Sequence, residues 1–209
     1  MIHKNVTLLL VAISLSLFFS CNESSQYRRA DKELSTPKAN KLVINPFQPV
    51  DVSPMDMSYW PADYPKLHMA GQLKTPPLAR VIYSRPQLQG RKIFPEILQY
   101  EQLWRLGANE ATELQLFKDA EVEGQPIKAG RYTLYCIPHP DSWTLIFNTT
   151  TDTWGLREEH STDFARVEVP VTQSALELEH FTMVFLEKET QAELFIGWGN
   201  LDTRIRFKF

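Results

Sequence analysis

Cysteine, histidine and an excess of charge of either sign are all scarce in this chain. Its 209 residues include 2 cysteines and 5 histidines, and the formal net charge is −3. So few thiols exclude a disulfide framework, and the scattered histidines show no ligand spacing for a metal. The nearly neutral charge offers no basic stripe, which argues against nucleic-acid binding. We therefore expect no metal, no cofactor and no nucleic-acid partner.

Familiar catalytic signatures are missing as well. The sequence contains no G-x-S-x-G elbow, no P-loop and no H-E-x-x-H motif. Cys136 lies in the apolar, strand-like run YTLYCIP, which predicts a buried side chain. The nearest histidine, His139, is flanked by prolines that indicate a turn. We therefore do not expect a catalytic cysteine–histidine pair.

A long hydrophobic run occurs only at the start of the chain. Lys4 precedes a largely apolar stretch, Val6–Phe19, and Cys21 follows shortly afterwards. The stretch is too short for a typical membrane-spanning helix but fits the hydrophobic region of a signal peptide. The pattern resembles a bacterial lipoprotein signal, in which Cys21 would become the lipidated N-terminus. The alternative is an ordinary secretory signal with an incidental cysteine.

Composition divides the chain into three parts. We predict a signal peptide at residues 1–20, a flexible tether at 21–50 that starts with the lipidated Cys21, and a single β-rich domain at 51–209. A lipid at Cys21 would hold the domain at the cell envelope, on the outer membrane or the periplasmic face. Prolines are dense in residues 51–78, which argues against a helix or a central strand there. We expect an extended segment over the core.

From residue 78 onward the sequence has the pattern of β-strands. Alternating or compact apolar runs are separated by turn residues, in LARVIYS (78–84), ATELQLF (111–117), AEVEGQPIKAGRYTLYCIP (120–138), WTLIFN (143–148), ARVEVPV (165–171), LELEHFTMVFLEK (176–188), AELFIGWG (192–199) and TRIRFKF (203–209). This spacing predicts an all-β fold, either an antiparallel, jelly-roll-like β-sandwich or a flattened barrel. One short helix is expected within residues 94–107.

Several motifs in this part of the chain, taken together, resemble one known family. They are YSRPQLQGRKIF (83–94), LWRLGANEATEL (103–114), IKAGRYTLYCIP (127–138), WTLIFN (143–148) and WG (154–155). Their order resembles domain-of-unknown-function family 2911 (DUF2911), common among secreted and lipid-anchored proteins of Bacteroidetes-type bacteria. The resemblance covers about residues 50–209. It implies an exported β-rich domain and no particular reaction.

The stretch from Tyr83 to Thr112 concentrates side chains suited to recognition. The candidate binding residues are Tyr83, Arg85, Arg91, Trp104, Arg105, Asn109, Glu110 and Thr112. Arginine offers a planar fork of donors for carboxylates and phosphates, and tryptophan offers a flat face for stacking. Such a patch could bind a carbohydrate, a small anion or another envelope protein without catalysis. Alternatively it is structural, with Arg85 or Arg105 paired to Glu110 in the interior.

Two further alternatives remain open. Glu96 and Glu110 could form the acid/base pair of an envelope hydrolase, although ordinary salt bridges explain such carboxylates better. The chain could also be a purely structural envelope component. Our main hypothesis is a lipid-anchored binding module that is not an enzyme.

Overall fold

The computed structural model describes residues 51–156, 160–188 and 191–209. The predicted signal peptide, the lipidated Cys21 and the tether up to residue 50 lie outside these residues. Asp51–Phe209 forms one compact unit. In the described part of the chain, no helix combines the length and the apolar character needed to cross a membrane.

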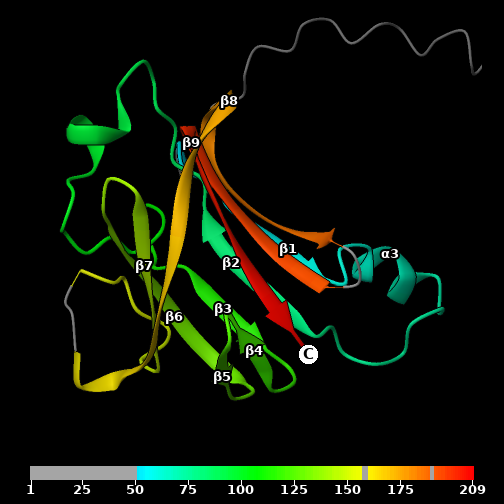
Figure 1. Ribbon diagram of the computed structural model, residues 1–209. Helices are drawn as coiled ribbons and strands as arrows, with labels where there is room; N and C mark the ends of the chain where they lie inside the picture. The colour runs from blue at the N-terminus through cyan, green and yellow to red at the C-terminus, as the bar shows by residue number, and fades with distance from the viewer. Residues whose placement is uncertain (1–50, 157–159, 189–190) are drawn as a thin grey trace, which may run out of the picture. The chain divides into compact units, whose positions relative to one another are not determined.

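The described residues form one antiparallel sheet with the strand order β1-β2-β3-β6-β7-β8-β9-β4-β5 (Figure 1). The strands are β1 (Met55–Trp60), β2 (Ala79–Ser84), β3 (Glu113–Leu116), β4 (Ala120–Val122), β5 (Gln125–Ile127), β6 (Gly130–Pro138), β7 (Ser142–Asn148), β8 (Asp163–Lys188) and β9 (Gln191–Lys208). Strands β1 and β5 are the two edges of the sheet, which does not close into a barrel. The predicted antiparallel all-β class is confirmed.

The two longest strands differ from the sequence prediction in their continuity. ARVEVPV and LELEHFTMVFLEK belong to one strand, β8, whose first half pairs with β7 and whose second half pairs with β9. The register of β8 against β9 shifts between Gln173 and Leu178 and again between Leu178 and Thr182. Such shifts bend a strand without ending it, so polar residues that suggested a loop lie at a bend. Figure 1 shows β8 and β9 curving across the molecule.

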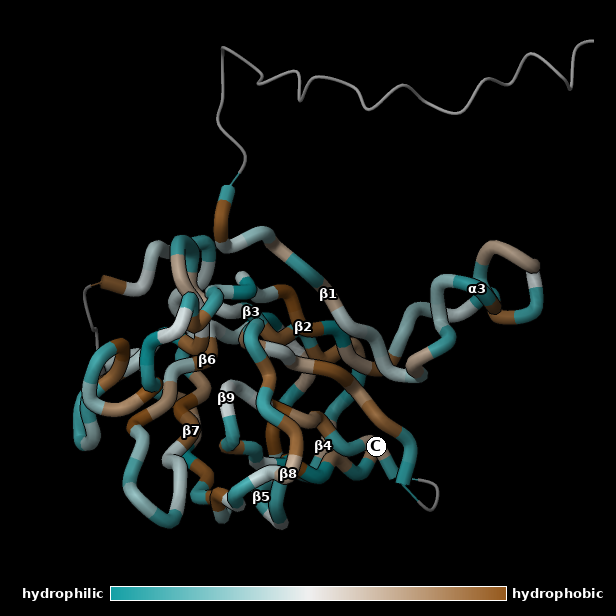
Figure 2. Tube along the Cα trace, turned by 90° about the horizontal axis from the view of Figure 1, so that it is seen from above, coloured by the Kyte–Doolittle hydropathy of each residue, from teal (hydrophilic) through white to brown (hydrophobic). Residues whose placement is uncertain are grey.

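The core lies between the two halves of this bent sheet. The ring of Tyr83 on β2 meets the ring of Phe181 on β8 edge-on, with centroids 5.8 Å apart. The backbone N–H of Phe185 on β8 donates to the hydroxyl of Ser58 on β1 at 2.9 Å. Hydrophobic and hydrophilic residues are mixed along the strands (Figure 2), and buried and exposed positions alternate in the first part of β8. Alternation along each strand therefore places one face in the core.

The predictions for the helices need correction. The proline-rich segment 51–78 contains the edge strand β1 and also a short helix, α3 (Tyr64–Met69). Pro65 stands in the first turn of α3, where a missing N–H breaks no helical hydrogen bond. No residue of α3 is buried, and the helix lies beyond the end of β1, where the ring centroids of Tyr59 and Tyr64 are 5.5 Å apart (Figures 1 and 2).

The other helical segments are shorter still. The helix expected within residues 94–107 is a single irregular turn, η1 (Ile93–Ile97), interrupted by extended backbone angles at Phe94. A 3-10 turn, η2 (His160–Thr162), precedes β8. Most of the segment between β2 and β3 is therefore a long loop that has no regular structure of its own.

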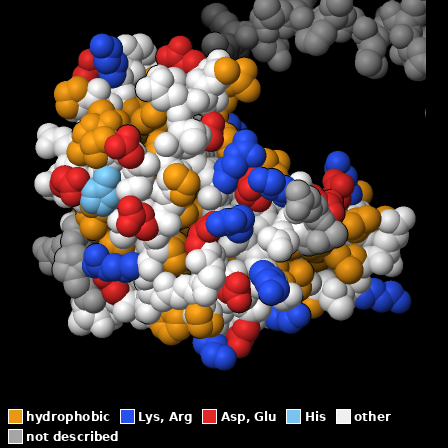
Figure 3. Space-filling view, viewed as in Figure 1, with side chains coloured by type: hydrophobic (Ala, Val, Ile, Leu, Met, Phe, Trp, Pro, Cys, Tyr) orange, Lys and Arg blue, Asp and Glu red, His pale blue; other side chains and the backbone are white. Residues whose placement is uncertain are grey.

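Charged side chains on the surface are interspersed rather than sorted by sign. Acidic and basic groups alternate over the face seen in Figure 3. On β9, Arg204 contacts Glu193 at 2.9 Å and Arg206 contacts Glu123 at 2.6 Å. The charges of this strand are therefore largely compensated by near neighbours.

Candidate functional site

The stretch LWRLGANEAT, residues 103–112, is fixed to the sheet through its backbone. Trp104 and Cys136 exchange two backbone hydrogen bonds, each 2.7 Å long. The hydroxyl of Ser84 accepts a hydrogen bond from the Ala108 N–H at 2.7 Å and donates one to the Ala108 carbonyl. Because these polar groups are satisfied internally, the loop has a defined conformation despite its lack of regular structure.

Trp104 connects this loop to an aromatic cluster. Its side chain is 7% exposed, and the indole N–H donates to the carbonyl of Gly107 at 3.2 Å. The Trp104 ring lies nearly parallel to that of Trp198, with centroids 5.9 Å apart, and meets the rings of Trp143 and Phe181 edge-on. Such pairs add to the stabilisation from burial alone. The cluster therefore forms a rigid floor beneath the loop.

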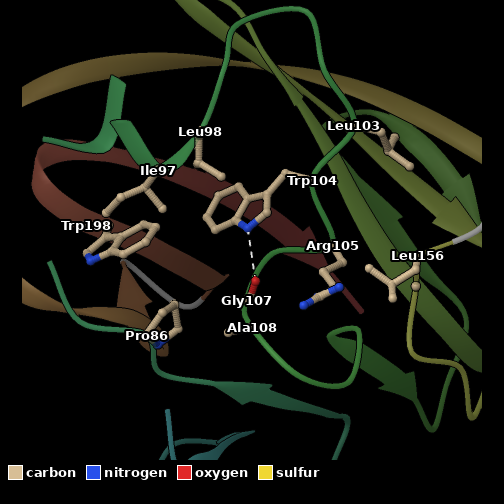
Figure 4. A pocket seen from close by; sticks show the side chains of 11 residues that line it. Pro86, Ile97, Leu98, Leu103, Trp104, Arg105, Gly107, Ala108, Leu156 and Trp198 are labelled. Carbon is tan, nitrogen blue, oxygen red and sulfur yellow. Dashed lines mark hydrogen bonds between the residues drawn. The ribbon is translucent and has the colours of Figure 1, made fainter. Parts of the chain in front are cut away.

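A cleft of about 340 Å³ opens above this floor. We call it the Arg105 cleft; its lining residues are Pro86, Ile97, Leu98, Leu103, Trp104, Arg105, Gly107, Ala108, Gly155, Leu156 and Trp198 (Figure 4). All of these side chains except that of Arg105 are apolar or aromatic, or belong to glycine. Its volume lies at the lower end of the range found for small-molecule sites.

Arg105 is the single charged residue in the lining. Its Nε is buried without a hydrogen-bond acceptor, and no described residue forms an ion pair with its guanidinium. In Figure 4 the guanidinium points toward the space beside Ala108 and Leu156. Arg80 also has an unpaired buried Nε, but its Nη2 donates to Gln115 at 2.6 Å. A guanidinium without any acceptor in apolar surroundings is a donor group ready for an anion.

Gly155, the second residue of the WG pair at 154–155, packs closely against Arg105 at the rim of the cleft. Gly155 has a φ of +73°. A Cβ atom there would come within 2.8 Å of the Ala111 Cβ and 3.2 Å of the Arg105 Cβ. Only glycine combines this backbone conformation with so close an approach. Gly155 therefore holds Leu156 at the rim.

Two of the predicted binding residues, Tyr83 and Arg85, both contact the carboxylate of Asp56, not that of Glu110. Arg85 contacts Asp56 at 3.1 Å and also donates to the Phe181 carbonyl and the Thr182 hydroxyl. The Tyr83 hydroxyl donates to Asp56 at 3.4 Å, and burial raises the pKa of Tyr83 to about 12. The predicted pairing of Arg85 with Glu110 is wrong, because Asp56 on the adjacent strand β1 is the partner.

The remaining predicted residues also lie outside the lining of the Arg105 cleft. Arg91 donates to the carbonyls of Leu88 and Gln87, and Asn109 donates to Asp51 at 2.6 Å. The hydroxyl of the buried Thr112 donates to the Leu106 carbonyl at 2.6 Å, which fixes the loop. Of the eight predicted binding residues, the cleft therefore brings together two, Trp104 and Arg105.

Neither glutamate of the hydrolase alternative lines the Arg105 cleft. Glu96 accepts a hydrogen bond from the backbone N–H of Lys92 at 3.1 Å, within its own turn. Glu110 is exposed and pairs with neither Arg85 nor Arg105 among the described residues. The contacts of the described residues therefore place neither Glu96 nor Glu110 beside a substrate-binding cleft.

Other potentially reactive groups are engaged or buried. His139 contacts Glu101 through Nδ1 at 2.6 Å and Thr144 through Nε2 at 3.2 Å, in the turn between β6 and β7. The Cys136 side chain is buried, and burial raises the pKa of its thiol. Within the described residues, no group of three or more His, Cys, Asp and Glu could hold a metal.

Most residues that line the Arg105 cleft were not among the predicted binding residues. Trp198 comes from β9 and Leu156 from the connection between β7 and β8, both distant along the chain from Arg105. The one local signal for Trp198 was its place between two glycines in the run AELFIGWG. Glycines beside an aromatic residue in a strand mark close packing, but they do not say against what.

Comparison with known proteins identifies the family. The chain matches the family described as "Protein of unknown function (DUF2911)" over residues 69–207. No curated protein and no solved structure matches it. The matched region contains every residue that lines the Arg105 cleft.

Proposed function

This chain belongs to the DUF2911 family, and we propose that it is a non-enzymatic module that binds a small organic anion in the Arg105 cleft. The observation that carries the proposal is the Arg105 guanidinium, which has no acceptor among the described residues and lies in an otherwise apolar lining. A lipid at Cys21 would hold this module at the cell envelope. That part of the proposal rests on the sequence alone.

The composition of the cleft favours an anion with an apolar body over the other predicted ligands. Carbohydrate sites need several side chains that exchange hydrogen bonds with hydroxyl groups, and this lining offers one. A carboxylate could accept two hydrogen bonds from the guanidinium, while its apolar portion contacts Trp104 and Trp198. An envelope protein could reach the same cleft through an acidic residue, but 340 Å³ suits a small molecule better.

The alternatives of a hydrolase and of a purely structural component remain predictions. No contact of Glu96 or Glu110 favours the first. The second explains Tyr83, Arg85 and Thr112 well, because their polar atoms bond within the protein. It does not explain Arg105, which makes no side-chain hydrogen bond to a described residue.

The decisive experiment compares ligands that differ only in charge. Aryl- and alkyl-carboxylates would be titrated beside their primary amides, with tryptophan fluorescence and calorimetry as readouts, since Trp104 and Trp198 line the cleft. We expect carboxylates to bind more tightly than the amides. Arg105→Met should weaken carboxylate binding by roughly 10- to 100-fold, and Arg105→Lys by less, because lysine keeps the charge and loses the fork.

Arg166→Met is the matched control, because Arg166 is a surface arginine paired with Asp163 and lies outside the cleft. It should leave carboxylate affinity unchanged. Equal affinity for acid and amide, or full affinity in Arg105→Met, would contradict the proposal.

The membrane anchor needs its own test. The full chain would be produced in a bacterium with a lipoprotein pathway and labelled with a fatty acid. We expect Cys21→Ser to lose the label and to leave the membrane fraction, because the acylated thiol is absent. Label retained in Cys21→Ser would show that the anchoring proposal is wrong without affecting the cleft.

A further inference from the structure

A second cavity, of about 600 Å³, lies between the loop that follows β2 and the bend of β8 and β9. We call it the Tyr100 cavity. Its walls come from the 88–94 segment with Tyr100, from Gln173, Glu177 and Glu179 of β8, and from residues 199–201 of β9. It shares no lining residue with the Arg105 cleft.

One wall of this cavity is an aromatic pair. The rings of Phe94 and Tyr100 are stacked, with centroids 4.0 Å apart and planes inclined by 12°. Tyr100 is 41% exposed, and its hydroxyl has no hydrogen-bond partner among the described residues. An exposed aromatic ring offers an electron-rich face to which the C–H groups of a sugar ring are attracted.

The other walls carry polar side chains with unused hydrogen-bonding capacity. Within the described part of the chain, no side-chain hydrogen bond or ion pair involves Lys92, Gln173, Glu177 or Asn200, which all line the cavity. Together they offer ammonium and amide donors as well as amide and carboxylate acceptors. Hydroxyl groups both donate and accept hydrogen bonds, so a ligand rich in hydroxyls can use every one of these groups.

The charges in the lining cancel. Arg91 and Lys92 contribute two positive charges, and Glu177 and Glu179 contribute two negative ones. Arg91 and Glu179 are partly engaged, since Arg91 donates to two carbonyls and Glu179 accepts from the Gln89 N–H at 2.8 Å. A balanced lining gives no net attraction for an anion or a cation, in contrast to the cleft at Arg105. It favours a neutral polar ligand.

The floor of the cavity has a fixed shape. Gly199 has a φ of +54°, and a Cβ atom there would lie 2.9 Å from the Ile93 side chain. The Leu88 N–H and the Trp198 indole N–H both donate to the Glu179 carbonyl, at 3.0 and 3.2 Å. The loop, β8 and β9 are therefore held together at this point, and the polar side chains project from a backbone that is already ordered.

From these observations we infer that the Tyr100 cavity binds a neutral pyranose unit of a carbohydrate. The sugar ring stacks on Tyr100, and its hydroxyl groups bond to Asn200, Gln173 and Glu177. This site is independent of the proposed anion site, so either can fail without the other.

The test uses neutral methyl pyranosides and short neutral oligosaccharides of the same sugars, titrated into the domain at millimolar concentration and followed by protein NMR. We expect shifts of the side-chain amide signals of Asn200 and Gln173 and of backbone signals near Tyr100. Tyr100→Ala should weaken the binding by roughly tenfold, whereas Tyr100→Phe, which keeps the ring, should change it by only about twofold.

Two controls make the result specific. Phe164→Ala removes another exposed aromatic ring and should leave sugar binding unchanged, as should Arg105→Met. Sugars carrying a carboxylate or an ammonium group should bind no more tightly than their neutral counterparts. The inference is overturned if no neutral sugar perturbs these signals, if the shifts map to the Arg105 cleft, or if folded Tyr100→Ala binds as well as the parent protein.

Discussion

The Arg105 cleft and the Tyr100 cavity are built on neighbouring residues of one strand, yet their chemistry differs. Trp198 of β9 lines the first and Gly199 lines the second. The first has apolar walls and one unpaired cation, and the second has polar walls in which opposite charges cancel. Successive residues of a strand face opposite sides, so one strand can serve two sites. Ligand preference here follows from the loop residues that cover each side, not from the shared strand.

Among the substitutions that test this comparison, Trp198→Ala is expected to have the largest effect on stability and on ligand binding at both sites. Trp198 packs on Trp104 and Phe181, and its indole N–H donates to the Glu179 carbonyl beside the second cavity. Loss of this buried ring should lower the free energy of unfolding by about 3–5 kcal/mol. Urea denaturation measures the change, and ligand titrations should show both sites weakened. A loss in one site only would mean that the strand does not couple them.

Alkaline pH should act on both sites through the core they share. Tyr83 packs on Phe181, and burial raises its pKa from 10.0 to about 12. The pKa of Tyr83 is higher in the folded protein than in the unfolded chain. The neutral, buried hydroxyl therefore contributes fully to the free energy of unfolding below pH 10, and about 2–3 kcal/mol of that free energy is lost as the pH rises toward 12. Tyr83→Phe should reduce this loss, measured as stability against pH. Tyr132, whose pKa burial also raises, accounts for part of the remainder. An unchanged profile in Tyr83→Phe would contradict the assignment.

Thr112→Val should separate the two sites. The Thr112 hydroxyl donates to the Leu106 carbonyl, and its N–H donates to the Arg105 carbonyl, so it fixes the loop of the first cleft alone. Removing the hydroxyl leaves a buried carbonyl unpaired and should cost about 1–2 kcal/mol in thermal or urea unfolding. Anion binding should weaken, while the amide signals of Asn200 keep their positions. Shifts at Asn200 would show that the loop supports both cavities.

Arg105→Leu should have the smallest effect on stability. The side chain forms no ion pair with a described residue and its Nε has no acceptor, so its removal breaks no hydrogen bond. The free energy of unfolding should stay within about 0.5 kcal/mol of the parent value, or rise. A loss of several kcal/mol would show that Arg105 is structural, as the alternative interpretation of this loop requires.

The sequence was most informative where a pattern depends on near neighbours. The strand runs LARVIYS and WTLIFN correspond to β2 and β7 because alternation or compact hydrophobicity is a local property. The sequence was less informative where a strand bends without ending or where a proline begins a helix. The polar residues after ARVEVPV suggested a loop, whereas bulges carry β8 through them. Pro65 suggested the absence of a helix, although the first turn of α3 accepts it.

The candidate site was predictable only in part, because its members meet across long sequence separations. Trp104 and Arg105 were singled out by their chemistry and do line a cleft. The partner of Arg85 was misassigned because Asp56 becomes its neighbour only when β1 pairs with β2. Of the residues that line the Tyr100 cavity, only Arg91 was among the predicted binding residues, since the floor of the cavity forms where β8 bends and no local pattern marks that point.

The position of β9 between β8 and β4 also bears on how the chain assembles. The ribosome delivers residue 120 long before residue 207, yet β4 pairs with β9 through Glu121–Lys208 and Val122–Phe207. Phe207 and Trp198 belong to the same core cluster as buried residues of β2, β6 and β7, so this core is complete only when the last strand is in place. A sheet that depends on pairing between residues so distant in sequence is expected to form slowly.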